Sequence, residues 1–214
     1  MGKSNSYIDR FLTLKCAGDI INILQPISSG TAKEVSEAWT IFKRVRKQVF
    51  KAEKGYYNLV ELCAGNPVSG LISHFCLPFK WTVSIDKRLI KREYSKIERY
   101  SYITKNIYDN DITKYIDDRS IIISSHPCKD LASRIVDIYN TTEAAGLYLL
   151  PCCEGAIPQF FQKQFLLKQL GRYYLWSYWL ATQCCGKIEI DKKCISPKNC
   201  IITALIPHPE KDVK

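Results

Sequence analysis

The side chains able to bind a ligand gather just after short apolar runs of this chain. Glu61 stands near the end of one run, the small-residue turn Cys63–Pro67 follows it, and Asp86 ends the next run 25 residues further on. A small-residue turn lets a ligand approach the backbone, and the helix after it offers free amides. A carboxylate such as Asp86 can accept hydrogen bonds from both hydroxyls of a ribose. The spacing therefore predicts a nucleotide-type site.

A second group of reactive side chains follows two later apolar runs, and its members are His126, Cys128, Lys129, Asp130, Cys152 and Cys153. Histidine titrates near neutral pH, so His126 can serve as a base or orient a hydroxyl. Lys129 can stabilise developing negative charge or bind phosphate. Asp130 can orient either of them or cap the helix that starts there. The alternatives are a packed structural role for His126 and a small, close-packed strand end for the two adjacent cysteines.

The apolar runs that carry these residues alternate with amphipathic stretches, which is typical of βαβ units and a largely parallel sheet. We expect strands at Tyr57–Leu62, Trp81–Ile85, Ser101–Thr104, Ser120–Ser124, Gly146–Leu150, Lys187–Asp191 and Asn199–Leu205. Only the short segment Lys192–Lys198, with a Ser-Pro turn, links the last two strands, so they should form an antiparallel hairpin.

Helices are expected on both faces of this sheet. Apolar spacing predicts helices over residues 7–24 and 32–53, the second opened by a capping box of Thr31 and Glu34, and an aromatic helix over Gln159–Gln183. The predicted fold class is therefore α/β, with a seven-stranded, mostly parallel sheet. The expected organisation is an N-terminal helical extension (1–55), a ligand-binding domain (56–207) and a short tail (208–214).

The run from Val60 to Gly70 resembles class I methyltransferases that use S-adenosylmethionine, whose first strand ends in an acid and a glycine-rich turn. Cys63 and Pro67 stand where that family usually has glycine. The resemblance implies a Rossmann-like fold, with Glu61 near the methionine amino group and Gly65 beside the cofactor. Asn106 replaces the usual acid at the adenine turn. The implied cofactor contacts are Glu61, Cys63, Ala64, Gly65, Asn66, Pro67, Asp86, Lys87, Asn106, Ile107 and Ser124. A domain that binds NAD is the alternative, but Gly-x-Gly-x-x-Gly is absent.

The later motifs narrow the resemblance. His126-x-Cys128 together with Cys152-Cys153 is similar to the branch containing the tRNA acceptor-stem 2′-O-methyltransferases and related methyltransferase-like proteins, although Lys129 replaces the expected glycine. The similarity covers roughly residues 57–206. It implies methylation of an RNA ribose, with His126, Cys128, Lys129 and Asp130 as the catalytic candidates.

Three other functions stay open. An RNA cytosine-5 methyltransferase would use Cys128 and one of the later cysteines, because that chemistry needs a thiolate that adds to the base. Ser125, however, stands where that family has an aspartate. The missing glycines at Cys63 and Pro67 also fit a cofactor-binding partner subunit without its own activity. The third alternative is a small-molecule or protein methyltransferase.

Charge and cysteine usage bear on partners and location. The net charge of +10, concentrated in Lys43–Lys54 and Lys87–Arg99, predicts binding to RNA, most simply tRNA, through its phosphates. No run of 18 apolar residues or secretory leader is seen, and the ten cysteines do not resemble a disulfide framework, so we expect a reduced, cytoplasmic protein. The CC-x8-C-x5-C pattern of the last four cysteines lacks the CxxC of zinc sites, and no metal is predicted.

Overall fold

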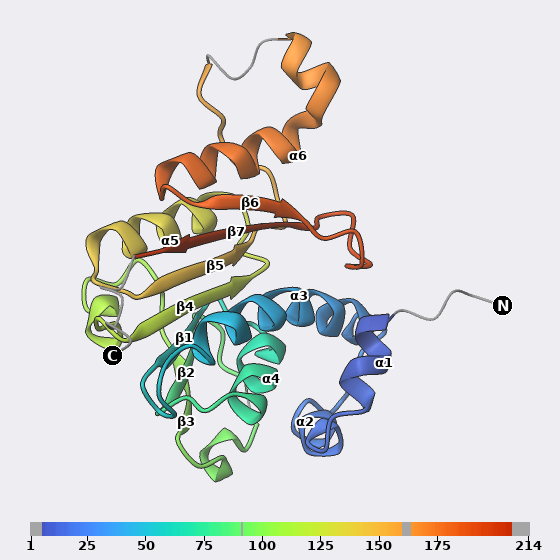
Figure 1. The fold of residues 1–214 in the computed structure, drawn as a ribbon, viewed down its shortest axis with the longest axis vertical. Coiled ribbons are helices and arrows are strands. Elements are labelled where there is room, and N and C mark those ends of the chain that lie inside the picture. Colours follow the sequence, from blue (N-terminus) through green and yellow to red (C-terminus); the bar gives the residue numbers. More distant parts are fainter. Residues whose placement is uncertain (1–5, 91, 160–163, 207–214) are drawn as a thin grey trace, which may run out of the picture.

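The structure, a computed structural model, describes residues 6–90, 92–159 and 164–206 (Figure 1). Its elements are α1 (Ser6–Leu12), α2 (Ala17–Ile23), α3 (Thr31–Val49), β1 (Asn58–Leu62), α4 (Val68–Cys76), β2 (Thr82–Asp86), η1 (Tyr94–Lys96), β3 (Tyr100–Thr104), η2 (Ile112–Tyr115), β4 (Ser120–Ser125), α5 (Asp130–Thr141), β5 (Gly146–Leu150), α6 (Gln164–Gln183), β6 (Lys187–Ile190) and β7 (Cys200–Leu205). The predicted tail 208–214 and residues 160–163 of the predicted aromatic helix lie outside the described ranges.

One seven-stranded sheet organises the molecule, in the order β3-β2-β1-β4-β5-β7-β6. The first five strands pair in parallel, and β7 is antiparallel to both of its neighbours. The predicted fold class and the terminal antiparallel pair are confirmed. Because β7 lies between β5 and β6, the last of the described strands is an interior strand of the sheet.

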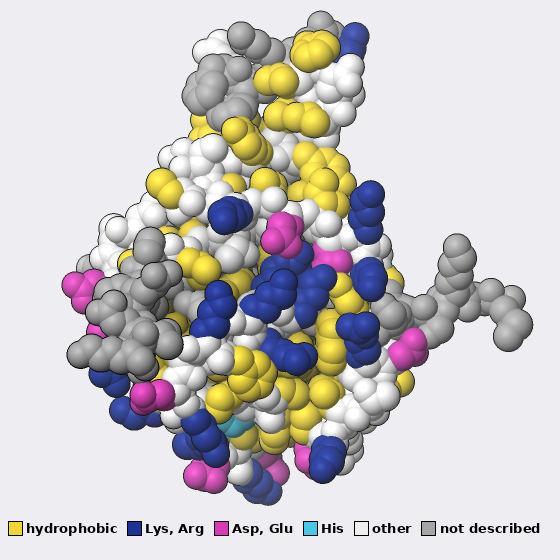
Figure 2. Space-filling view, in the orientation of Figure 1, with side chains coloured by type: hydrophobic (Ala, Val, Ile, Leu, Met, Phe, Trp, Pro, Cys, Tyr) yellow, Lys and Arg dark blue, Asp and Glu magenta, His cyan; other side chains and the backbone are white. Residues whose placement is uncertain are grey.

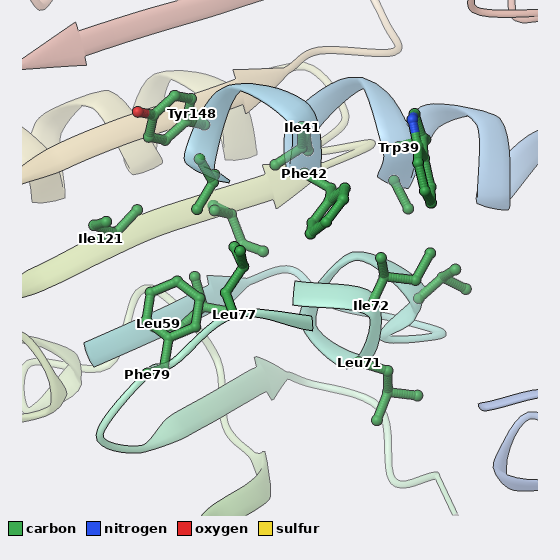
Figure 3. Close-up of a cluster of buried hydrophobic side chains, with 14 of the residues drawn as sticks. Trp39, Ile41, Phe42, Leu59, Leu71, Ile72, Leu77, Phe79, Ile121 and Tyr148 are labelled. Carbon is green, nitrogen blue, oxygen red and sulfur yellow. The ribbon is translucent and has the colours of Figure 1, made fainter. Parts of the chain in front are cut away.

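Helices cover both faces of the sheet, α3 and α4 one face and α5 and α6 the other (Figure 1). On the first face Trp39 and Phe42 of α3 and Leu71 and Ile72 of α4 pack over strand residues such as Leu59 (Figure 3). A fully buried aliphatic or aromatic side chain contributes roughly 1.5–3 kcal/mol. Helix α3, from the segment expected as an extension, thus shares one hydrophobic cluster with α4 and the strands.

The N-terminal segment differs from the prediction in two places. The prediction of one helix over 7–24 was wrong, because the structure has two helices there, α1 and α2. The first ends at Leu12, where the Thr13 hydroxyl donates to the Arg10 carbonyl (2.8 Å) and competes with the helical hydrogen bonds. The predicted capping box was also wrong. Gly30 is the N-cap of α3, while Glu34 accepts a hydrogen bond from the Asn66 side chain (2.8 Å).

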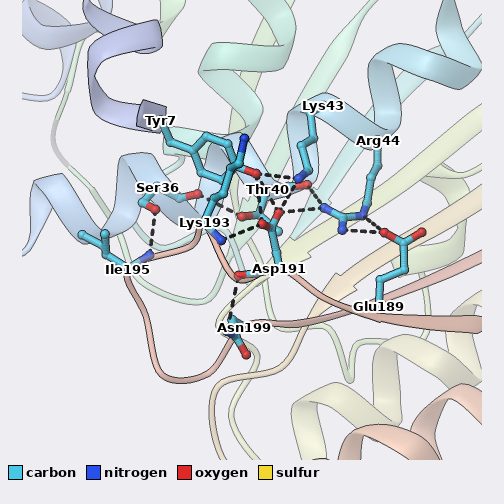
Figure 4. Close-up of polar contacts among 10 residues, drawn as sticks. All are labelled: Tyr7, Ser36, Thr40, Lys43, Arg44, Glu189, Asp191, Lys193, Ile195 and Asn199. Atoms are coloured by element: carbon cyan, nitrogen blue, oxygen red, sulfur yellow. Dashed lines mark hydrogen bonds and ion pairs between the residues drawn. The ribbon is translucent and has the colours of Figure 1, made fainter. Parts of the chain in front are cut away.

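A buried charge network ties the two ends of the chain together (Figure 4). Asp191, 4% exposed, follows β6 and accepts hydrogen bonds from Tyr7 of α1 (3.0 Å) and Arg44 of α3 (3.1 Å) and pairs with Lys43 (2.6 Å). Burial acts to raise the pKa of Asp191, but the hydrogen bonds from Lys43 and Arg44 outweigh it, and the pKa falls to about 2. Arg44 also binds Glu189. The network therefore anchors α1 to the end of the sheet.

Helix α6 has a kink at Gly171, whose φ of +76° is easily adopted only by glycine. The aromatic residues after the kink divide between inside and outside: Tyr173 and Trp176 are buried, and Tyr178 is 50% exposed. Within the described ranges, none of the helices is both long enough and apolar enough to cross a membrane.

Candidate active site

A cavity of about 170 Å³ lies where the carboxyl ends of β1 and β4 meet. Neighbouring parallel strands end at this edge, where open α/β sheets bind their ligands. Its lining combines the turn after β1, the start of α3 and the end of β4, and consists of Glu34, Cys63, Ala64, Gly65, Asn66, Val68, Arg88, Ser125 and His126. Four of the predicted cofactor contacts and one predicted catalytic residue thus meet in one pocket.

The turn after β1 has the left-handed backbone that close approach of a ligand requires. Gly65 has a φ of +51° and Cys63 a φ of +54°, which costs a non-glycine residue about 1–2 kcal/mol. Burial raises the pKa of the Cys63 thiol to about 12, so this cysteine is a neutral lining residue. Pro67 precedes α4 as its N-cap. The turn can therefore present its backbone to the cavity even though only one of its glycines is kept.

Asp86, at the end of β2, adjoins this turn. Its Oδ2 accepts from the Gly65 amide (2.8 Å), and its Oδ1 accepts from the Arg88 amide (2.9 Å) and guanidinium (3.0 Å). Burial acts to raise the pKa of Asp86, but the bonds from Arg88 and Gly65 prevail and the pKa lies below its ordinary value. The Arg88 side chain is 65% exposed, and its guanidinium occupies the space that a Cβ on Gly65 would enter. Arg88 therefore covers the carboxylate predicted to bind ribose.

Glu61 is fully buried beneath α4 and does not line the cavity. Its two oxygens accept from the Gly70 amide (3.0 Å) and the Ser84 hydroxyl (2.6 Å), and a Cβ on Gly70 would collide with the carboxyl group. Burial raises the pKa of Glu61 to about 8, although both hydrogen bonds lower it. In this conformation the carboxyl joins β1, β2 and α4 and is not open to an amino group in the cavity.

The remaining predicted cofactor contacts lie around the pocket without lining it. Asn106 is exposed and accepts a hydrogen bond from the Tyr108 amide (3.2 Å), while Ile107 is buried in the core. Lys87 is exposed beside Asp86. Ser124 is buried, and its hydroxyl donates to the Leu62 carbonyl (2.7 Å); its neighbour Ser125 lines the cavity instead.

His126 forms the reactive corner of the cavity. Its Nε2 contacts the Glu37 carboxylate, which comes from α3 and is fully buried. The backbone of His126 is left-handed (φ +67°), and its amide donates to the Leu150 carbonyl (3.0 Å). A carboxylate behind an imidazole fixes the ring's orientation and tautomer. The pair can therefore hold His126 ready to interact with a substrate.

The other predicted catalytic residues lie beside this corner. Lys129, with a φ of +49°, is the N-cap of α5 and is exposed, and Asp130 begins the helix. Cys128 lies close to two thiols from the turn after β5: its Sγ is 3.2 Å from that of Cys152 and 3.5 Å from that of Cys153. Burial raises the pKa of the Cys128 thiol. The structure thus places a cluster of three thiols next to His126.

The two basic segments differ in how many of their cations are bound to acceptors within the protein. Lys and Arg side chains gather over α3 (Figure 2), where Arg46 and Lys47 are exposed near the end of the helix, while Lys43 and Arg44 bind Asp191. Most of the described cations of Lys87–Arg99 have acceptors within the protein. Arg88 binds Asp86, Lys96 binds Glu93 (2.5 Å), and Arg92 contacts the Asn66 side chain.

Four polar residues at the site were not predicted to belong to it: Glu34, Glu37, Arg88 and Ser125. Glu34 and Glu37 are one helical turn apart on α3, at its end nearest the cavity. That spacing placed both on one helix face, but nothing in the sequence showed that this face meets the carboxyl edge of the sheet. The position of Arg88, two residues after Asp86, was the one sequence feature that could have placed its side chain at this carboxylate.

Comparison with known proteins bears on the fold. No family model and no curated protein matches the sequence. The crystal structure of the CurJ carbon methyltransferase is similar, with a TM-score of 0.56 at 12% identity over 88% of this chain, which spans 58% of that protein. The plantazolicin methyltransferase BpumL, solved with SAH, matches at 10% identity over 93% of both chains, with a TM-score of 0.48. Together with the strand order, the similarity to CurJ shows that this chain has the Rossmann-like fold of class I methyltransferases.

Proposed function

We propose that this protein is an S-adenosylmethionine-dependent methyltransferase. The observation that carries the proposal is the pocket at the carboxyl edge, in which the left-handed turn Cys63–Gly65 lies against the Asp86 carboxylate. A methyltransferase fold with this arrangement offers backbone for the methionine part and a bidentate acceptor for the ribose. The bound cofactor would supply an electrophilic methyl group.

The cavity fits this cofactor only after a local movement. Its volume of about 170 Å³ is below the roughly 300 Å³ at which small-molecule sites begin. Arg88 occupies the space between Gly65 and the solvent, on a side chain that is 65% exposed. If the Arg88 side chain turned outward, Asp86 would lose its guanidinium contacts but would still accept from the Gly65 and Arg88 amides, and the remaining lone pairs of both oxygens could accept from a ligand. The residues that would hold the cofactor are therefore Asp86 and the turn from Cys63 to Asn66.

The role proposed for His126 is to orient the attacking group of the substrate and accept its proton. The ring lines the cavity and is held from behind by the buried Glu37. A positioned histidine of this kind contributes about 10²–10⁴ to a rate. We assign Glu37 as the positioning residue. Lys129, exposed two residues beyond Pro127, would bind a phosphate of the substrate.

RNA is the proposed substrate, with a ribose hydroxyl as the methylated group. Helix α3 supports this choice because it joins the two parts that such a substrate needs. Its first turns carry Glu34 and Glu37 at the pocket, and its last turns carry the exposed Arg46 and Lys47. The 19-residue helix is about 28 Å long, so an RNA lying along it could contact the cations with its phosphates while one nucleotide enters the cavity.

Two experiments test the function in sequence. Calorimetry with S-adenosylhomocysteine and with NADH tests the cofactor, and binding of NADH alone would contradict the proposal. Incubation of total RNA with labelled cofactor, followed by nucleoside mass spectrometry, tests the substrate. Incorporation into a 2′-O-methylated nucleoside is expected. Tight cofactor binding without incorporation would favour the partner-subunit alternative.

The RNA surface has its own matched test. The double substitution Arg46→Glu and Lys47→Glu should weaken RNA binding and flatten its dependence on salt, since about two phosphate contacts are lost. Lys114→Glu is the control because Lys114 lies outside both basic segments and is already paired with Asp111. Equal effects of the two changes would argue against a substrate bound along α3.

A further inference from the structure

Three thiols meet at the carboxyl ends of β4 and β5, just beyond the cavity. Cys128 follows β4, and Cys152 and Cys153 follow β5. The two strands are parallel neighbours with Ser125 opposite Leu150, so the chain after each strand reaches the same point. Both turns place a proline directly before the first cysteine. The cluster is therefore built by the topology of the sheet, from residues 24 and more positions apart.

The distances within the cluster suit a shared metal ion. The three Sγ–Sγ separations are 3.2, 3.5 and 3.5 Å. A zinc ion bound to thiolates at about 2.3 Å in a tetrahedron separates them by roughly 3.8 Å. A disulfide needs about 2.05 Å. Small side-chain adjustments would bring all three thiols to the first of these distances, whereas a disulfide would use two of them and leave the third out.

We propose that Cys128, Cys152 and Cys153 bind a thiophilic metal ion of the zinc type. Thiolates select such ions over Mg²⁺ and Ca²⁺, which take oxygen ligands. Among the described residues, these three form the one group of three or more His, Cys, Asp or Glu side chains that are close enough to share an ion. The last four cysteines of the sequence, with the CC-x8-C-x5-C pattern, form no such group among the described residues.

The proposed site leaves one coordination position open. Three protein ligands with an open fourth position are characteristic of zinc sites that take up water or a substrate atom. Cys128 and its neighbour Lys129 are exposed, so a water molecule or a substrate atom could reach an ion held there. The thiols of Cys128 and Cys152 now lie 3.7 and 3.4 Å from the His126 carbonyl. A bound ion would replace these S–H hydrogen bonds, because cysteines bind it as thiolates.

The test uses the full-length protein, purified under reducing conditions and freed of metal with a chelator. Co²⁺ is titrated in, and thiolate-to-cobalt charge-transfer absorption reports sulfur ligation; Zn²⁺ is then added as the competitor. Uptake of about one ion per chain, displaced by Zn²⁺, is expected. Cys128→Ser and Cys152→Ser should each weaken binding by at least about a hundredfold, since even outer-shell changes cost tenfold to a hundredfold.

Cys185→Ser is the matched control, because Cys185 is exposed and does not belong to the cluster. It should bind Co²⁺ as the wild type does. Circular dichroism shows whether each variant folds, and the exposed position of Cys128 makes its variant the more tolerant one. Calorimetry with S-adenosylhomocysteine on the same samples separates failure of this proposal from failure of the proposed function.

Two results would overturn the proposal. One is a folded, reduced wild-type protein that takes up no Co²⁺ or Zn²⁺. The other is a triple serine variant that binds as tightly as the wild type. A Cys128–Cys152 disulfide found by mass spectrometry, together with no metal uptake after reduction, would be a case of the first result. It would assign the cluster to redox chemistry instead of metal binding.

Discussion

The carboxyl edge of the sheet has two halves that differ in how their polar groups are satisfied. In the cofactor half, formed by Glu61, Gly65 and Asp86 after β1 and β2, each carboxylate accepts hydrogen bonds from backbone amides and neighbouring side chains. In the reaction half, formed by His126 and the three thiols after β4 and β5, the thiols contact one another and the His126 carbonyl, and Cys128 is exposed. In the cofactor half the protein itself occupies the acceptors, so a ligand must displace the Arg88 guanidinium from Asp86. In the reaction half the exposed Cys128 can be reached by a substrate without such a displacement.

The largest expected effect comes from a substitution in the reaction half, which should lower methyl transfer and leave cofactor affinity unchanged. His126→Ala should lower methyl transfer by about 10²–10⁴ because the oriented imidazole is lost. Affinity for S-adenosylhomocysteine should stay within about twofold, a change of less than 0.5 kcal/mol. Labelled-methyl transfer and calorimetry measure the two quantities.

Glu37→Gln is the companion change, since it keeps the shape of the partner behind His126 but removes its charge. It should reduce kcat by about tenfold and leave KM unchanged, as expected of a residue that acts through another. A rise in KM alone would mean that Glu37 serves substrate binding and not the orientation of His126.

The next effect breaks the cofactor half. Asp86→Asn should weaken S-adenosylhomocysteine binding by roughly 30- to 100-fold, because charge-assisted hydrogen bonds to the ribose contribute about 1.5–3 kcal/mol each. Calorimetry measures the loss. Unchanged affinity would show that the ribose binds elsewhere, and the cofactor half would then have only a structural role.

Glu61 provides a test of how deeply the cofactor half is built into the fold. Its pKa of about 8 lies above the ordinary value near 4.3, so the folded protein keeps a proton that the unfolded chain has lost. The free energy of unfolding should therefore fall as pH rises between about 4.3 and 8, by up to 1.4 kcal/mol per pH unit.

Glu61→Gln should remove this part of the pH dependence. Urea unfolding at several pH values between about 5 and 8 compares the two slopes. Identical slopes for the variant and the wild type would mean that the carboxyl titrates normally and is more accessible than its burial indicates.

The smallest expected effect concerns Arg88, whose side chain lies over Asp86 and Gly65 in the cofactor half. Arg88→Ala removes its ion pair with Asp86, and partly exposed pairs contribute up to about 1 kcal/mol. Affinity for S-adenosylhomocysteine should therefore rise by up to about fivefold. Lys96→Ala, at an exposed cation that is paired with Glu93 and is not among the predicted cofactor contacts, is the control and should change little. Weaker binding by the Arg88 variant would show that the Arg88 side chain contacts the cofactor and contributes to its affinity.

The sequence predicted the strands well because each is a short run with aliphatic or aromatic residues bounded by turn residues, and all seven lie within one or two residues of their expected bounds. The cofactor half was predictable for the same reason: its acids lie at strand ends. Ser124 and Ser125 show where such reasoning fails, since side chains alternate across a strand and a shift of one residue exchanges core and pocket. Glu37 could not be foreseen because its role depends on the packing of α3 against the sheet.

The Asp191 network has a consequence for how this chain is made. Tyr7 and Asp191 are 184 residues apart, and β7, which separates β5 from β6, comes later still. At 5–20 residues per second on a ribosome, roughly ten seconds or more separate the two ends. Until the last strands are made, Lys43 and Arg44 lack the Asp191 and Glu189 carboxylates that they bind in the folded protein, and the outer edge of β5 lacks β7. A nascent chain stalled before β6 therefore exposes an open sheet edge beside uncompensated charge, a form that chaperones and proteases can distinguish from the finished protein.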